Sequence, residues 1–261
     1  YQNTISGSFV MPCAEKGKFE NINITETHLE EDPAQWNPET GKIDYNRSGL
    51  PLIEIVTDPD FKSKEQVEKW LRNLLHSLSY IKALRKDAGI KCDVNISTYG
   101  ERVEIKNLNS IEKIKNAIAY EVQKQIENHK KGIKQKRETL AFDEKQGITI
   151  KMRSKEQAQD YRFIPDPDLP SIIINSKKVK ELEKELPETP QEKLNKLLEK
   201  YKLNSSDALI LTKNLELVDF FEELSNYVDS KKYITWITIE LLRVLNYNKT
   251  NLDEVTIQPK H

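Results

Sequence analysis

The chain has 261 residues, with 41 Lys and Arg against 42 Asp and Glu, and hydrophobic residues make up 37% of it. This balance excludes a global attraction to nucleic acid, so any RNA contact must come from local basic patches. The two cysteines are too few for a disulfide framework and suit a reducing cytosol. No apolar run approaches the roughly 20 residues of a membrane span. We therefore expect a cytoplasmic protein with one large and one small domain.

The first part of the chain, residues 1–60, predicts short strands and loops, ending with the strand Leu52–Val56. Ser63-Lys64-Glu65-Gln66 then matches a capping box, in which the Ser63 hydroxyl and the Gln66 side chain satisfy free N–H groups. The apolar residues that follow recur at helical spacing. They predict a long amphipathic helix.

Alternating residues on both sides of Tyr99-Gly100 predict a β-hairpin with these two residues as its turn. The expected cross-strand pairs are Asn95 with Glu104, Asp93 with Lys106, Ile96 with Val103 and Val94 with Ile105. One face is then apolar and the other charged, and a slip of one residue would undo this separation.

A second long helix is predicted from Ser110, with an apolar face made of Ile111, Ile114, Ile118, Val122 and Ile126. A basic tail follows this helix and contains Lys130, Lys131, Lys134, Lys136 and Arg137. Residues Phe142–Met152 return to strand character.

The composition changes after Asn175, where Lys, Glu and Leu begin to dominate and helical periodicity takes over. We therefore predict an α+β fold with a mainly antiparallel sheet in residues 1–175, followed by an all-helical domain in residues 176–261. Pro187 and Pro190 separate two of the predicted helices.

Two acidic groups are candidates for chemistry. The run His28–Asp32 contains three adjacent acids, which most often form a solvated loop. On the charged hairpin face, Asp93 and Glu104 are diagonal neighbours about 7–8 Å apart at Cα. Two such carboxylates can hold a hard divalent cation, or the face can consist of ordinary cross-strand ion pairs.

A basic group is the third candidate. Arg153, Lys155 and Arg162 can clamp phosphate, because a guanidinium offers a planar fork of donors. The alternative is a structural crossover fixed by prolines and surface ion pairs. The sequence contains no glycine-rich phosphate loop, so a nucleotide would be held by metals and basic side chains.

Several separate runs resemble the B-subunit family of the tRNA-dependent amidotransferases, and they occur in that family's order. These runs are His28–Asp32, Asp44–Val56, Lys91–Asn95, Glu104–Ser110 and Tyr161–Pro170. The helical end is similar too, at Trp236–Thr238 and Glu240–Leu242. A set this long is more specific than any single motif.

The resemblance implies a cradle-shaped domain related to glutamine synthetase, followed by a helical domain that binds tRNA. It implies a ligase that uses ATP and Mg²⁺ to phosphorylate the side-chain carboxylate of Glu or Asp esterified to tRNA. Ammonia from glutamine would then displace the phosphate. The expected partners are the amidase that releases this ammonia, which is the A subunit of such enzymes, a small C subunit, and the misacylated tRNA.

The resemblance also implies roles for individual residues. Glu31 and Asp93 are the expected catalytic metal ligands, with Glu104 as a third ligand and Lys106 as a further catalytic residue. Arg47, Arg153 and Arg162 are the expected contacts to ATP phosphates or substrate.

Two departures from the family pattern bear on these roles. Full-length members begin with a strand whose Glu and His help to bind the metal, and no run here matches it, so we expect an incomplete metal site. Members also usually end in a tail domain that reaches the tRNA. A non-catalytic tRNA-binding adaptor is the alternative function. A paralogue restricted to Glu-tRNA, the E subunit, would be expected to carry an inserted domain, and none is seen between Asn175 and the helices. Glu-tRNA and Asp-tRNA both remain candidate substrates.

Overall fold

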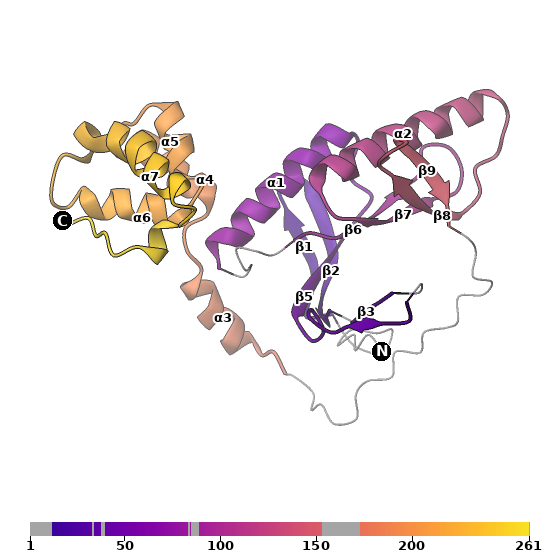
Figure 1. Cartoon of the computed structure of the whole chain (residues 1–261), viewed down its shortest axis with the longest axis horizontal. Coiled ribbons are helices and arrows are strands. Elements are labelled where there is room, and N and C mark those ends of the chain that lie inside the picture. The colour runs from indigo at the N-terminus through magenta and orange to yellow at the C-terminus, as the bar shows by residue number, and fades with distance from the viewer. Residues whose placement is uncertain are drawn as a thin grey trace. The chain divides into compact units, whose positions relative to one another are not determined.

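The structure is a computed structural model that describes residues 12–32, 34–37, 40–82, 84, 89–152 and 173–260 (Figure 1). The chain divides into two compact units. The sheet unit contains Tyr1–Leu71 and Gly89–Lys180, and the helical unit contains Arg72–Ala88 and Glu181–His261. The domain boundary expected near Asn175 stays a prediction. Within the described ranges, no helix is long and apolar enough to cross a membrane.

The first sheet of the sheet unit is antiparallel, with the strand order β1-β2-β5. Its strands are β1 (Ala14–Phe19), β2 (Ile22–Glu31) and β5 (Pro51–Thr57). The connection from β2 to β5 contains a two-stranded ribbon made of β3 (Gln35–Trp36) and β4 (Ile43–Asp44). His28 lies opposite Glu54 in this sheet, and Glu31 lies opposite Pro51.

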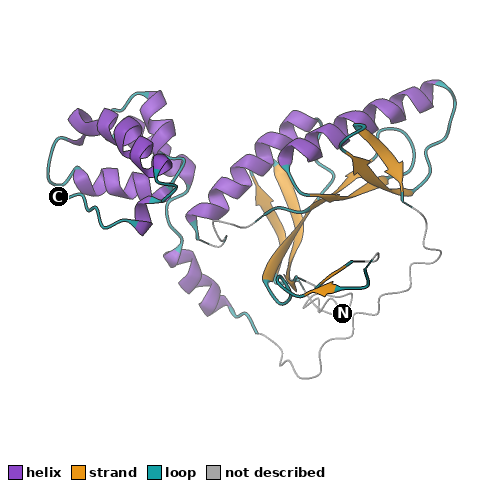
Figure 2. Cartoon of the chain, viewed as in Figure 1, coloured by secondary structure: helices purple, strands orange, loops and turns teal. Residues whose placement is uncertain are grey.

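The second sheet has the order β6-β7-β8-β9, and only the β7–β8 pair is parallel. Its strands are β6 (Cys92–Ile96), β7 (Val103–Leu108), β8 (Glu138–Asp143) and β9 (Ile148–Lys151). The helix α2 (Ile111–Lys130) lies across one face of this sheet (Figure 2). Together with the helical C-terminal region, these sheets confirm the predicted α+β class.

The two predicted helix starts are confirmed at the hydrogen-bond level. The helix α1 (Lys64–Tyr80) begins where the Ser63 hydroxyl accepts from the Gln66 N–H at 3.1 Å. The Gln66 side chain accepts from the N–H of Lys62 at 2.8 Å rather than from Ser63, so the reciprocal bond of the expected capping box is shifted by one residue. Before α2, the Ser110 hydroxyl accepts from the Lys113 N–H at 3.2 Å.

The inner face of α2 is partly polar. Ile114 and Ile118 pack against buried residues of the second sheet, as expected from their spacing, and Ala117 packs there too. The next two positions of this face are Glu121 and Gln125, which are 0% and 1% exposed. The Gln125 amide donates to the Glu121 carboxylate at 3.1 Å. Beyond Ile118, the buried face of the helix is therefore formed by a hydrogen-bonded polar pair.

The helical unit is built from short helices around a separate apolar core. The helices are α3 (Ser176–Glu185), which continues from the sheet unit, α4 (Pro190–Glu199), α5 (Ser205–Leu211), α6 (Leu215–Leu224), a π-helical segment (Trp236–Leu241) and α7 (Leu242–Tyr247). Their core includes the fully buried Leu211, Phe221 and Ile237. The second half of α1 also belongs to this unit, and there the buried Tyr80 hydroxyl donates to the Thr212 carbonyl at 2.8 Å.

A buried lysine ties two helices of this unit together. The Lys193 ammonium of α4 pairs with Asp219 at 3.1 Å and with Glu222 at 2.5 Å, both on α6. Burial alone would lower the pKa of Lys193, but its hydrogen bonds to Glu222 and Asp219 outweigh this effect and raise the pKa.

This raised pKa predicts a loss of stability in alkali. Because the folded pKa lies above that of the unfolded chain, the Lys193 contribution is complete below about pH 10.4 and is lost as the pH rises further. We expect the free energy of unfolding, measured by denaturant titration from pH 8 to 11, to fall more steeply in the unmodified chain than in Lys193→Met. Equal slopes would show that Lys193 does not contribute in this way.

Candidate active site on the sheet unit

The predicted hairpin register is confirmed next to its loop. The observed pairs are Asn95 with Glu104, Ile96 with Val103 and Val94 with Ile105. Strand pairing ends at Ile96 and Val103, so residues 97–102 form a wider loop than the expected two-residue turn. Within this loop, the Ser97 hydroxyl donates to the carbonyl of Gly100 at 2.9 Å.

Asp93 contacts Lys106 as expected, but a β-bulge interrupts the regular ladder at this point. Cys92 pairs with Leu108, so both Lys106 and Asn107 lie opposite Asp93. Asn107 has a φ of 63°, a conformation that Asn tolerates better than most residues. The Asp93 carboxylate accepts from the Asn107 N–H at 3.0 Å and therefore satisfies a donor at the bulge.

Lys106 lies between two carboxylates on the polar face of the hairpin. Its ammonium is 3.1 Å from Asp93 Oδ2 and 3.1 Å from Glu104 Oε1. Glu104 also accepts from the Thr139 hydroxyl of β8 at 3.4 Å. Burial alone would lower the pKa of Lys106, but the hydrogen bonds to Glu104 and Asp93 raise it. The cluster therefore presents two carboxylates and a permanent cation.

A second polar group lies on β2 and β5. His28 is 3.2 Å from Glu26, and its buried Nδ1 has no hydrogen-bond partner among the described residues. Burial raises the pKa of the Glu30 carboxyl, and the charge of Glu54 raises it further. The charges of His28 and Lys91 act in the opposite direction, so Lys91, just before β6, lies within electrostatic range of Glu30.

Glu30 belongs to the acidic run His28–Asp32, in which the resemblance assigned a role to Glu31 instead. Side chains alternate between the two faces of a strand, so Glu30 shares a face with His28, whereas Glu31 points to the opposite face. The sequence signal for this shared face was the spacing of two residues between His28 and Glu30.

The remaining predicted site residues are dispersed. Arg47 lies in the turn before β5, and its guanidinium is 2.8 Å from the Asp32 carboxylate. Arg153 and Arg162 lie outside the described residues. No three His, Cys, Asp or Glu residues of the described part come together in a way that could hold a metal. Asp93 and Glu104 both pair with Lys106 on the second sheet, whereas Glu31 lies on the first sheet. The assignment of Glu31, Asp93 and Glu104 as metal ligands stays a prediction.

Comparison with known proteins now places this site in a family. The family model described as the GatB/GatE catalytic domain matches residues 1–180. The chain is 47% identical over 261 residues to the B subunit of the aspartyl/glutamyl-tRNA(Asn/Gln) amidotransferase of Methanococcus maripaludis strain C5. The B subunits of the same name from Methanocaldococcus jannaschii and Methanothermobacter thermautotrophicus are 45% identical over 260 residues and 44% identical over 250 residues.

These alignments cover 96%, 96% and 95% of this chain, in the same order, and 56%, 55% and 56% of the relatives. The chain therefore spans little more than half the length of the curated relatives that it matches. The family match itself extends over both sheets and includes the Asp93, Glu104 and Lys106 cluster. On this evidence, the chain belongs to the GatB/GatE catalytic domain family.

Proposed function

We propose that this chain carries the ATP-dependent activating centre of a tRNA-dependent amidotransferase, a ligase that converts Glu or Asp esterified to tRNA into the amide. Membership of the GatB/GatE family and the names of the archaeal relatives support this proposal. The observation that carries it is the cluster in which Lys106 pairs with both Asp93 and Glu104.

The proposed reaction has two steps. An oxygen of the side-chain carboxylate attacks the γ-phosphorus of ATP, the bond to ADP breaks, and an acyl phosphate forms. Ammonia then attacks the acyl carbon, the phosphate leaves with the bonding electrons, and loss of a proton gives the amide. The first step is needed because a carboxylate is a poor electrophile. Positive charge near the phosphates stabilises the charge that develops there.

The residues of the cluster fit the chemistry of a magnesium site. Mg²⁺ is usually bound by one or two carboxylates together with phosphate oxygens and water. Asp93 and Glu104 are two carboxylates that already share one cationic partner. Bound Mg²⁺ would neutralise charge on the ATP phosphates. The Lys106 ammonium, which lies between these two carboxylates, would pair with a phosphate oxygen, and we keep Glu31 as a proposed further ligand.

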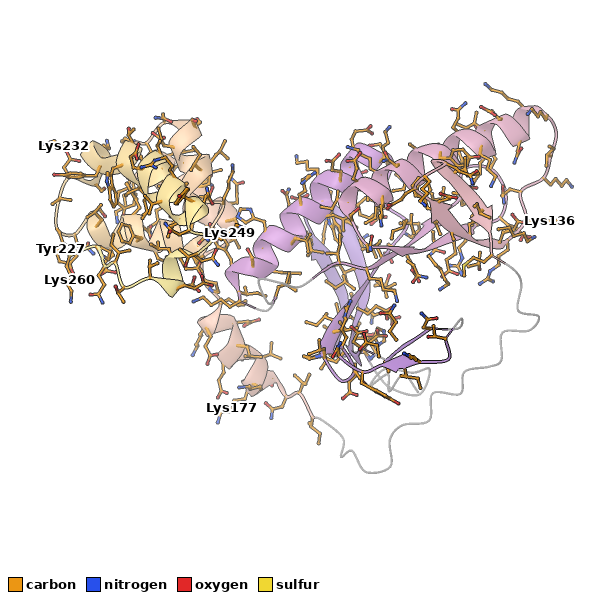
Figure 3. The ribbon with its side chains drawn as sticks, in the orientation of Figure 1. Lys136, Lys177, Tyr227, Lys232, Lys249 and Lys260 are labelled. Atoms are coloured by element: carbon orange, nitrogen blue, oxygen red, sulfur yellow. The ribbon has the colours of Figure 1, made fainter. Side chains whose placement is uncertain are left out.

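We further propose that ammonia comes from a partner amidase, the A subunit of such an enzyme, working with a small C subunit. The sequence shows no motif that pairs a nucleophile with a base for hydrolysing glutamine. We also propose that the helical unit contributes to tRNA binding. It exposes lysines that phosphate groups could contact, among them Lys232, Lys249 and Lys260 (Figure 3).

Trapping the activated intermediate tests the proposed reaction. We expect the assembled enzyme, given misacylated tRNA, ATP, Mg²⁺ and hydroxylamine, to form a hydroxamate and ADP, because hydroxylamine attacks an acyl phosphate. The diagnostic product is the hydroxamate of the side-chain carboxyl, because hydroxylamine also cleaves the ester at the α-carboxyl of any aminoacyl-tRNA. Correctly charged Gln-tRNA is the control and should give neither this side-chain hydroxamate nor ADP. Amide formation from ammonia without ATP, or without any trapped hydroxamate, would exclude this mechanism and favour the adaptor role.

A further inference from the structure

The segment that follows α2 carries a concentration of positive charge. Residues 128–137 contain five Lys and Arg residues and no Asp or Glu. We call these five exposed side chains the basic edge: Lys130, Lys131, Lys134, Lys136 and Arg137. Figure 3 labels Lys136 beyond the end of α2. Within the part of the chain that the structure describes, none of the five forms an ion pair, whereas Lys106, Lys115 and Lys151 of the same unit do.

The backbone of the basic edge is fixed by several contacts. After α2, the Ile133 N–H donates to the Asn128 carbonyl at 2.9 Å, and Gly132 takes a φ of 72° that favours glycine. The Arg137 N–H donates to the Glu101 carboxylate in the hairpin loop at 2.9 Å. The charges are therefore held along one segment of the sheet unit.

The hairpin loop packs closely against this segment. A Cβ at Gly100 would lie 3.2 Å from the Cβ of Gln135 and 3.3 Å from its carbonyl oxygen. The Tyr99 ring stacks on the ring of His129, with centroids 4.1 Å apart and planes 5° apart. Tyr99 is nevertheless 45% exposed, so an aromatic surface is accessible beside the cations.

Helix stabilisation does not account for all of this charge. Cations near the C-terminus of a helix interact favourably with its dipole, which explains Lys130 and Lys131. This effect falls off within the last turn, and Lys134, Lys136 and Arg137 lie beyond the helix. Like charges so close together repel one another, and a polyanionic partner would relieve that repulsion.

We propose that the basic edge binds the phosphate backbone of the tRNA substrate, an inference that rests on the proposed function. Lysines that contact phosphates release counterions from RNA, which supplies affinity without any need for sequence recognition. The exposed Tyr99 ring can also stack on an unpaired base. A membrane surface fits less well, because it requires an apolar face and Ile133 is the one large apolar residue between positions 128 and 137.

The test removes three charges from the basic edge. We expect the triple variant Lys131→Ala, Lys134→Ala, Lys136→Ala to bind a tRNA transcript about tenfold more weakly near 0.1 M salt. The slope of log affinity against log salt should fall by about one for each phosphate that the variant no longer reaches. A matched control removes the same charge from exposed lysines elsewhere on the sheet unit: Lys18→Ala, Lys62→Ala and Lys69→Ala. It should leave both quantities nearly unchanged.

The outcomes separate this surface from the proposed reaction. In the assembled enzyme, the basic-edge triple should raise KM for tRNA and leave kcat at saturating tRNA unchanged. The proposal would be overturned if the triple variant kept the tRNA affinity and salt slope of the unmodified chain. It would also be overturned if the variant lost binding to phosphatidylglycerol vesicles but not to tRNA. An enzyme that makes no amide, but whose tRNA binding falls in the triple variant, would exclude the proposed reaction while supporting this surface.

Discussion

Replacing Asp93 by Asn is expected to reduce ATP-dependent amidation by the assembled enzyme at least about 100-fold, as expected when a group at a metal site is removed. The substitution removes the charge that pairs with Lys106 and one of the two proposed carboxylate ligands. The fold should survive, because an Asn oxygen can still accept the Asn107 N–H that Asp93 satisfies. Losing an exposed ion pair of this kind costs about 0–1 kcal/mol of stability.

Glu138→Gln is the matched control for this prediction. Glu138 also forms a cross-strand ion pair on the second sheet, with Lys151 at 2.7 Å, but it lies outside the candidate cluster. Amidation and its Mg²⁺ dependence should be measured with ammonia as donor, so that glutamine hydrolysis does not enter. The control should retain normal turnover. Normal turnover by Asp93→Asn at low Mg²⁺ would rule out the assignment of Asp93.

Local sequence patterns were sufficient for much of the fold. Alternation on both sides of Tyr99-Gly100 predicted the correct register next to the loop, because only that register separates the apolar face from the charged one. The bulge at Asn107 was missed, since a single residue with positive φ leaves the alternation on either side intact. The bulge matters for the site because it places the Asn107 N–H where the Asp93 carboxylate accepts a hydrogen bond from it.

The buried face of α2 shows how a pattern can mislead. The predicted face followed steps of four residues from Ile114 to Val122, and each such step overshoots a helical turn by about 40°. Val122 does pack against the core, but the most buried face runs from Ile114 through Ile118 to Glu121 and Gln125. Glu121 has the spacing of the buried face. It was not predicted to be buried, because charged residues are usually exposed.

The candidate site was predictable to a different degree at each position. Asp93, Glu104 and Lys106 came together as expected because they share one sheet face and adjacent strands. The resemblance selected Glu31 among three adjacent acids, and the structure directs attention to Glu30 as well. The structure singles out Glu30 because burial and the charge of Glu54 raise its pKa. Glu54 lies on a strand distant in sequence, so this effect could not be predicted from the local pattern.

Glu121→Ala is expected to lower the free energy of unfolding of the sheet unit by about 3–5 kcal/mol, because it leaves buried polar groups without partners. The fully buried Glu121 carboxylate accepts from Gln125 at 3.1 Å and from the Thr149 hydroxyl of β9 at 2.8 Å. Gln125 in turn accepts from the Thr98 N–H at 2.9 Å, so the loss extends to the hairpin loop. Lys124, which also pairs with Glu121, is partly exposed and can turn towards solvent.

Glu127→Ala is the control on the same helix, because Glu127 is less buried than Glu121 and its side chain accepts from the Gln123 side chain at 2.8 Å. Its unfolding free energy should change by no more than about 0.5 kcal/mol. Both variants should be compared by denaturant titration of the full chain. A smaller loss should follow from Glu121→Gln, because its side-chain oxygen can still accept from the Gln125 amide or from the Thr149 hydroxyl. If Glu121→Ala and Glu127→Ala unfold at the same midpoint, the buried network does not hold α2 on the second sheet.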